Sequence, residues 1–126
     1  MQEIKELVNR YIQAIHTQDK EEFLSLWTGN EADTLISITK VYKGDQAIYD
    51  DFLIGAIQAK YSRIDLINDG LTIQLLDDKT AIVVFSYHTE CILCEDGTPF
   101  GIQGLETQVL RKIGSQWKIQ HIHYSK

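Results

Sequence analysis

The hydrophobic positions follow a helical period in the first half of the chain and a strand period in the second half. In residues 2–16, apolar residues recur every three or four positions, which predicts an amphipathic helix. These residues are Ile4, Leu7, Val8, Tyr11, Ile12 and Ile15. Asp19 and Glu22 have the spacing of a capping box, which predicts the start of a second helix. Asp45 can cap a third helix, whose apolar face would contain Ile48, Phe52 and Ala56.

Beyond Tyr61 the apolar residues alternate with polar ones, as they do in strands. The alternating segments are separated by turn-forming residues at 77–79, 95–98 and 114–115, and residues 68–70 are a turn or bulge signal, beyond which the strand pattern continues. Consecutive strands joined by turns this short pair antiparallel. An earlier β-branched run at 33–42 predicts one more strand, between the second and third helices. This order predicts an α+β fold in which three N-terminal helices pack on a curved, mostly antiparallel sheet.

The segment 81–93 indicates that both faces of this sheet carry apolar residues. One face would hold Ala81, Val83, Phe85, Tyr87, Thr89, Cys91 and Leu93. The other face would begin with Ile82 and Val84. Helices on one side can cover only one face, and a second subunit is the simplest cover for the other. We therefore expect a homodimer formed through the sheet.

Composition limits the classes of function. The chain has 126 residues, 44% of them hydrophobic, and a formal net charge of −6. This size suits a single domain over residues 1–126. Acidic and basic residues are mixed along the chain, which argues against a nucleic-acid partner. No apolar run approaches the roughly 20 residues that cross a membrane, and residues 1–13 lack a secretion-signal pattern. The expected location is therefore the cytoplasm.

Four segments resemble the NTF2-like superfamily, which has the cystatin-like cone fold, and together they extend over nearly the whole chain. They read RYIQAIHTQDKEEFLSLW, VYKGDQAI, LLDDKTAIVVF and GLETQVLRKIGSQWKIQHIHYS. Within that superfamily the sequence is most similar to the SnoaL-like and DUF4440 branch, and to the association domain of calcium/calmodulin-dependent protein kinase II. The resemblance implies a cone with a pocket. It implies no single activity, because the fold hosts isomerases, cyclases, dehydratases, transport factors and oligomerisation hubs.

The resemblance also allows a residue-by-residue comparison. Ketosteroid isomerases of this fold use a tyrosine on the first helix, an aspartate base and a protonated aspartate on a strand. Tyr11 falls on that tyrosine, but residues 35–40 offer no carboxylate for the base, and the strand aspartate falls near Leu105. The sequence therefore argues against that chemistry. The pocket arginines of the kinase domain fall on Tyr87 and Gln108, which are uncharged and suit a neutral or weakly polar ligand.

Three interpretations stay open for the histidine pair of the last strand. His121 and His123 would share one face, about 6.5–7 Å apart along the strand. They could hold a metal together with Glu90 or Glu106, act in acid–base or substrate-binding chemistry, or pack and hydrogen-bond as ordinary strand residues. Glu90 and Glu106 could be general bases if they are buried with a raised pKa. We expect no metal and no cofactor.

The sequence thus leaves two classes of function. The first is a pocket for a small, largely apolar ligand, with isomerase-, cyclase- or hydrolase-type acid–base activity as its possible chemistry. Tyr11 and His123 are its candidate catalytic residues, and the candidate ligand-binding residues are Trp27, Phe52, Tyr87, Gln108 and His121. The second is a non-catalytic dimerisation or oligomerisation module whose cone is filled by side chains. An open cavity of a few hundred Å³ with convergent polar groups would favour the first class.

Overall fold

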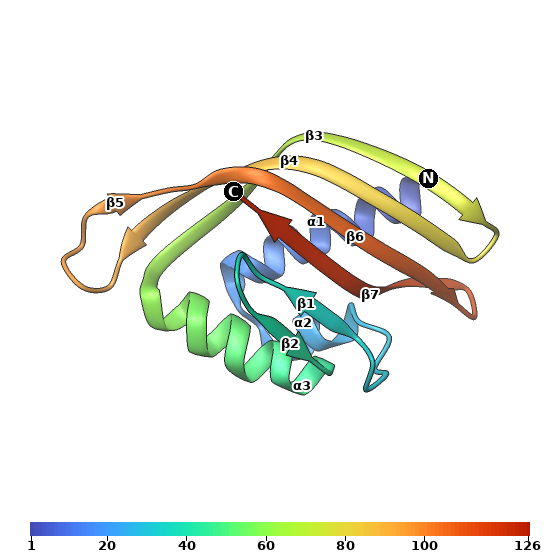
Figure 1. Cartoon of the computed structure of the whole chain (residues 1–126), viewed down its shortest axis with the longest axis horizontal. Coiled ribbons are helices and arrows are strands. Elements are labelled where there is room, and N and C mark those ends of the chain that lie inside the picture. Colours follow the sequence, from blue (N-terminus) through green and yellow to red (C-terminus); the bar gives the residue numbers. More distant parts are fainter.

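The computed structural model describes all of residues 1–126, in which a curved sheet wraps around a layer of helices (Figure 1). The helices are α1 (Gln2–Thr17), α2 (Lys20–Ser25), the single turn α3 (Asp45–Ala47) and η1 (Ile48–Gln58). The last of these continues directly from α3 and winds as a π-helix. None of the helices combines the length and the apolar character that a membrane span requires.

The sheet contains seven strands. They are β1 (Thr34–Ile36), β2 (Val41–Lys43), β3 (Tyr61–Asp77), β4 (Thr80–Leu93), β5 (Pro99–Phe100), β6 (Gln103–Ile113) and β7 (Gln116–Ser125). Their spatial order is β2-β1-β7-β6-β4-β3, with the short β5 paired to β4. All neighbours are antiparallel except β1 and β7, which run parallel. The predicted α+β cone is therefore confirmed, although the early strand at 33–42 is a short hairpin, β1–β2.

The first two helices form where the sequence predicts them. The buried face of α1 consists of Ile4, Leu7, Val8, Tyr11, Ala14 and Ile15. The helix ends at Gln18, which has a left-handed backbone (φ 59°) and donates its N–H to the Ala14 carbonyl. The side chain of Asp19 then accepts a hydrogen bond from the Glu22 N–H at 3.0 Å and so caps α2. This cap turns the chain back so that α2 packs beside α1.

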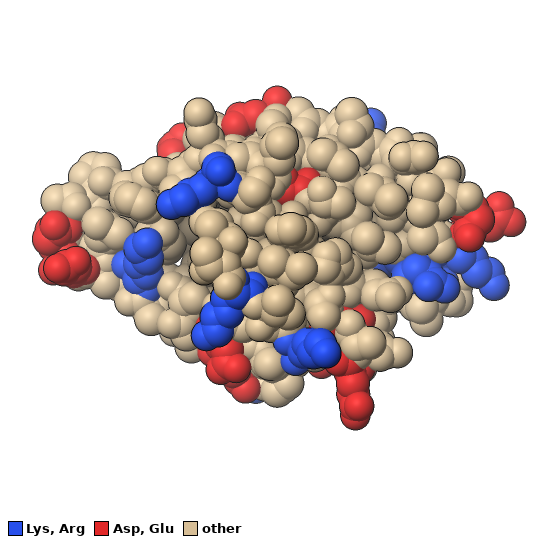
Figure 2. Space-filling view, in the orientation of Figure 1, with Lys and Arg blue, Asp and Glu red and all other residues tan.

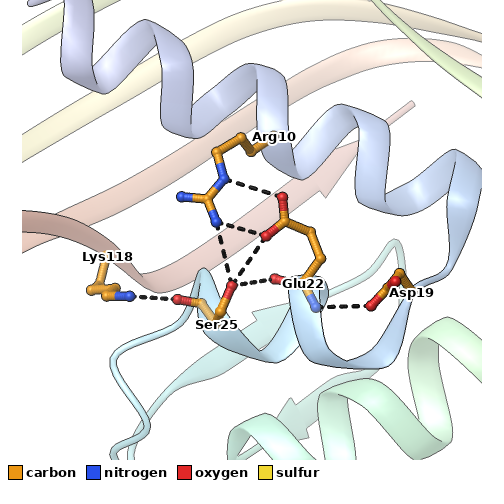
Figure 3. A network of polar contacts seen from close by, with 5 residues as sticks. All are labelled: Arg10, Asp19, Glu22, Ser25 and Lys118. Atoms are coloured by element: carbon orange, nitrogen blue, oxygen red, sulfur yellow. Dashed lines mark hydrogen bonds and ion pairs between the residues drawn. The ribbon is translucent and has the colours of Figure 1, made fainter.

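A polar network ties α1, α2 and β7 together at the surface (Figure 3). Arg10 of α1 binds both carboxylate oxygens of Glu22, with Nη2–Oε1 at 2.6 Å and Nε–Oε2 at 3.1 Å. Lys118 of β7 donates to the Ser25 carbonyl at 2.6 Å. These side chains are substantially exposed, so an ion pair of this kind contributes only about 0.5–1 kcal/mol. The network orients the helices, while the fully buried Phe23 beneath it supplies more of the stabilisation.

The two faces of the sheet differ in their surroundings. The concave face packs on the helices and buries alternate residues of β4, namely Ala81, Val83, Phe85, Tyr87 and Cys91. The convex face has no layer over it, and Val84 and Leu105 lie exposed there. The expectation that both faces carry apolar residues is confirmed.

The end of β7 crosses very close to β6. Gly104 has room only for hydrogen, because a Cβ atom on it would collide with the Ser125 carbonyl oxygen and the Lys126 Cα. Tyr87 also holds the end of β7 in place, since its hydroxyl donates to the Ser125 carbonyl at 2.8 Å. These two contacts fix the position of the last residues against the sheet.

Replacing Gly104 with Ala should lower the free energy of unfolding by about 1–3 kcal/mol, as overpacking does in other proteins. The backbone of Gly104 is not in the left-handed region, so the loss would be steric. Urea denaturation measures it. Gly70→Ala is the matched control, because its new methyl group would meet only the movable Ser86 hydroxyl. Equal stabilities of the two variants would contradict this close approach.

Candidate functional site

A cavity of about 210 Å³ lies between α1, η1 and the concave face of the sheet. Its wall is mainly apolar and includes Ile15, Phe52, Ile57, Ile64, Leu66 and Tyr61. Its mouth lies where η1 ends and β5 begins, and four side chains that are exposed to solvent line it: Ile38, Lys60, Phe100 and Lys126. The cone is therefore open rather than filled.

Glu106 lies at the buried end of this cavity. It projects from the concave face of β6, and only 3% of the residue is exposed. Burial raises the pKa of its carboxyl to about 7, against a smaller lowering by the hydrogen bond from Gln108. That bond joins Gln108 Nε2 to Glu106 Oε2 at 2.8 Å, and Oε1 accepts no hydrogen bond from the chain. At neutral pH both the acid and the carboxylate are populated.

Three tyrosines surround the Glu106 carboxyl. Burial, followed by the charge of Glu106, raises the pKa of Tyr11 well above its usual value. The same causes raise the pKa of Tyr87 to about 12, and burial with the neighbouring Tyr87 and Glu106 raises the pKa of Tyr124. All three are therefore neutral hydroxyls at physiological pH. The Tyr87 hydroxyl donates to Ser125, whereas those of Tyr11 and Tyr124 have no partner within the chain and can bind a ligand.

Three residues predicted from the sequence line the cavity: Tyr11, Phe52 and Tyr87. Two others that the sequence predicts as ligand-binding residues do not line the cavity but lie behind its wall. Trp27 is buried against Phe23, with ring centroids 6.1 Å apart. Gln108 is fully buried and reaches the site only through its hydrogen bond to Glu106. It therefore contacts Glu106 and does not line the cavity.

The two histidines of β7 do not line the cavity, which corrects their expected placement in the ligand site. Side chains alternate along a strand, and Ile122 and Tyr124 are the inward residues at this end of β7. His121 and His123 therefore occupy the convex face. His123 is exposed, and His121 Nδ1 lies 2.6 Å from Thr34 Oγ1. Burial, and then the charge of His123, lowers the pKa of His121.

The sequence named Glu106 as a general base on the condition that it is buried with a raised pKa, and the structure meets both conditions. The comparison with ketosteroid isomerases pointed to Leu105, but Leu105 is exposed on the convex face and the next residue faces the cavity. A usable signal existed, because Glu106 and Gln108 are two apart on one strand and must share a face. No group of three or more His, Cys, Asp and Glu side chains lies where it could hold a metal ion.

Replacing Glu106 with Gln should flatten the pH dependence of stability. Because its native pKa of about 7 exceeds the ordinary value of 4.5, the folded chain keeps a proton that the unfolded chain loses between these values. Wild-type stability should thus fall as pH rises from about 4.5 to about 7, by up to about 3 kcal/mol from this group. Denaturation at a series of pH values measures how the free energy of unfolding changes with pH in the wild type and in the variant. Identical slopes would refute the raised pKa of Glu106.

Comparison with known proteins agrees with this fold. Residues 4–126 match the model of the SnoaL-like domain. An NTF2-like superfamily protein from Salmonella enterica subsp. enterica serovar Typhimurium str. LT2 is 27% identical, with a TM-score of 0.93 over 98% of this chain and 88% of that one. No curated protein matches the chain.

Two further solved structures share the fold at lower identity. Hexachlorocyclohexane dehydrochlorinase LinA-type3 from Novosphingobium barchaimii LL02 is 12% identical over 97% of this chain and 82% of that one, with a TM-score of 0.85. A chain from Xanthomonas campestris, provisionally identified as a calcium/calmodulin-dependent protein kinase II association domain, is 21% identical over 98% and 84%, with a TM-score of 0.80. The match over nearly the whole chain shows that this protein belongs to the SnoaL-like family, within the NTF2-like superfamily.

Proposed function

We propose that this chain binds a small, largely apolar molecule in the cone and that Glu106 exchanges a proton or a hydrogen bond with it. The observation that carries this proposal is the position of Glu106. A carboxyl group whose pKa is near neutrality lies at the buried end of an open, mainly apolar cavity. A group held at such a pKa at the end of a cavity is typical of a binding or catalytic site.

The polar groups at the buried end suit acid–base chemistry on a carbonyl or hydroxyl group. Glu106 can donate when it is protonated and accept when it is ionised. Tyr11 and Tyr124 remain protonated and can only donate to an oxygen atom that gains negative charge. This set supports an isomerase-, cyclase- or hydrolase-type reaction, with Tyr11 in its expected role and Glu106 in the role first given to His123. The dehydrochlorinase of similar fold indicates that such a cone can house an enzyme.

A matched pair of neutral ligands tests the role of Glu106. 1-Tetralone accepts a hydrogen bond and 1-tetralol also donates one, while their apolar bodies are nearly identical. Tetralone should bind more weakly as pH rises through about 7, because Glu106 loses the proton that it donates. Tetralol should keep its affinity, since the carboxylate accepts from its hydroxyl. Ligand-observed NMR titration at pH values on both sides of 7 measures the two affinities.

Two variants control this experiment. Glu106→Gln should abolish the pH dependence, because an amide does not titrate in this range. Ala56→Trp should block both ligands by filling the cavity that Ala56 lines. Binding that is unchanged in Ala56→Trp would place the ligands elsewhere and contradict the proposal.

A second function, self-association through the sheet, is favoured by the convex face. The surface over the middle of β6, β7 and β1 is largely free of charged side chains (Figure 2). Val41, Val84 and Leu105 are exposed on that face. The similar chain provisionally identified as an association domain is consistent with assembly of this fold. We propose a homodimer that covers the convex face and leaves the cavity on the opposite side of the sheet accessible.

Replacing Val84 with Lys should convert this dimer to a monomer, because a buried lysine without a partner opposes association. Sedimentation velocity measures the mass. Leu76→Lys is the matched control, since Leu76 is similarly exposed but lies beside the β3–β4 turn, away from the middle of the face. A wild-type chain that sediments as a monomer would exclude the homodimer.

A further inference from the structure

The mouth of the cavity carries a local charge opposite to that of the whole protein. The formal net charge of the chain is −6, yet the two charged side chains that line the mouth are both lysines, Lys60 and Lys126. The only acidic residue that lines the cavity is Glu106, at its buried end. The cavity therefore has a cationic mouth, an apolar wall and an acidic buried end.

The fold brings both lysines to the mouth. Lys60 lies between η1 and β3, and its Nζ lies 5.4 Å from the ring centroid of Tyr61 and 5.0 Å from that of Phe100. These cation–π contacts hold the ammonium group above apolar groups of the mouth. Lys126 follows Ser125, whose carbonyl oxygen is bound by Tyr87 and packs against Gly104. The Lys60 ammonium is thus held by two aromatic rings, and the backbone contacts of the last residues bring Lys126 to the same mouth.

No carboxylate side chain of the chain neutralises these lysines, since neither takes part in a salt bridge within it. Three acidic residues of the adjoining surface already have partners of their own. Asp65 lies 2.8 Å from His16 and 3.1 Å from Arg63. Asp69 and Glu90 lie 2.6 and 3.2 Å from the two ring nitrogens of His88. The charges of Lys60 and Lys126 therefore remain available to an anion from outside.

The different charges at the two ends of the cavity also determine the orientation in which a charged ligand can bind. An anionic group placed at the buried end would lose its hydration in a site of low polarity, and it would also be repelled whenever Glu106 is ionised. At the mouth, the same group meets two ammonium groups and keeps part of its hydration. An apolar body then extends inward along Phe52 and Ile64.

We propose that the ligand of this cavity is an amphipathic acid, with an apolar body inside the cone and a carboxylate at the mouth bound by Lys60 and Lys126. This inference rests on the proposed ligand-binding function and specifies its ligand class. It keeps the largely apolar body expected from the sequence. The carboxylate of the ligand was not expected from the sequence, because the predicted pocket residues Tyr87 and Gln108 are uncharged.

The test compares 2-naphthoate with 2-naphthamide, which share a body and differ in charge. Titration calorimetry at about pH 6 keeps the naphthoate ionised and Glu106 mostly protonated. Naphthoate should bind about 5- to 20-fold more tightly at low salt, and the preference should shrink at about 1 M salt. Lys60→Met and Lys126→Met should each weaken naphthoate about 3- to 5-fold and leave naphthamide unchanged.

Lys60→Glu should abolish the preference, because the new carboxylate offsets the charge of Lys126, and Lys79→Met, at the distant β3–β4 turn, should change neither affinity. Naphthamide binding shows that each variant is folded. Equal affinities of the two ligands, or equal losses for both in Lys60→Met, would overturn the amphipathic ligand while the proposed function stands. Failure of naphthoate, naphthamide and tetralone alike to bind would overturn the proposed function as well.

Discussion

The site depends on one unfavourable interaction, the burial of the Glu106 carboxyl in an apolar cavity. An ionised carboxylate in such surroundings loses most of its hydration, and the hydrogen bond from Gln108 replaces only part of it. The group therefore holds its proton up to a pKa of about 7. The fold must be stable enough elsewhere to tolerate this, and a continuous core of 24 buried hydrophobic residues supplies that stability.

The curvature of the sheet makes both the cavity and the charge distribution possible. The concave face meets α1 and η1 (Figure 1). Together they enclose a cavity with a single acidic residue in its lining. The close approach at Gly104 brings the last residues back over the sheet, so that Lys126 reaches the mouth. The convex face stays separate, with His121 and His123 among its residues. Binding in the cone and association through the sheet can therefore coexist in one chain.

Most of the fold could be predicted because it follows from local patterns, such as the helical period of α1 and the alternation along β4. The β1–β2 hairpin was missed because its turn at 37–40 contains no glycine, proline or asparagine. The site was predicted less well. Alternation along β7 places His121 and His123 on the same face of the strand. It does not specify whether that face points to the cavity, because this depends on how β7 packs against the helices. The pairing of Lys60 with Lys126 at one mouth arises only from the tertiary fold.

The most direct measurement is the titration of the Glu106 side-chain carbon by ¹³C NMR, with Glu106→Gln used to assign the signal. The account predicts a midpoint near pH 7 in the free protein, and a displaced midpoint when tetralone occupies the cavity. A midpoint at the ordinary glutamate value, near 4.5, would show that the carboxyl is hydrated and would contradict the buried acid on which the proposed function rests.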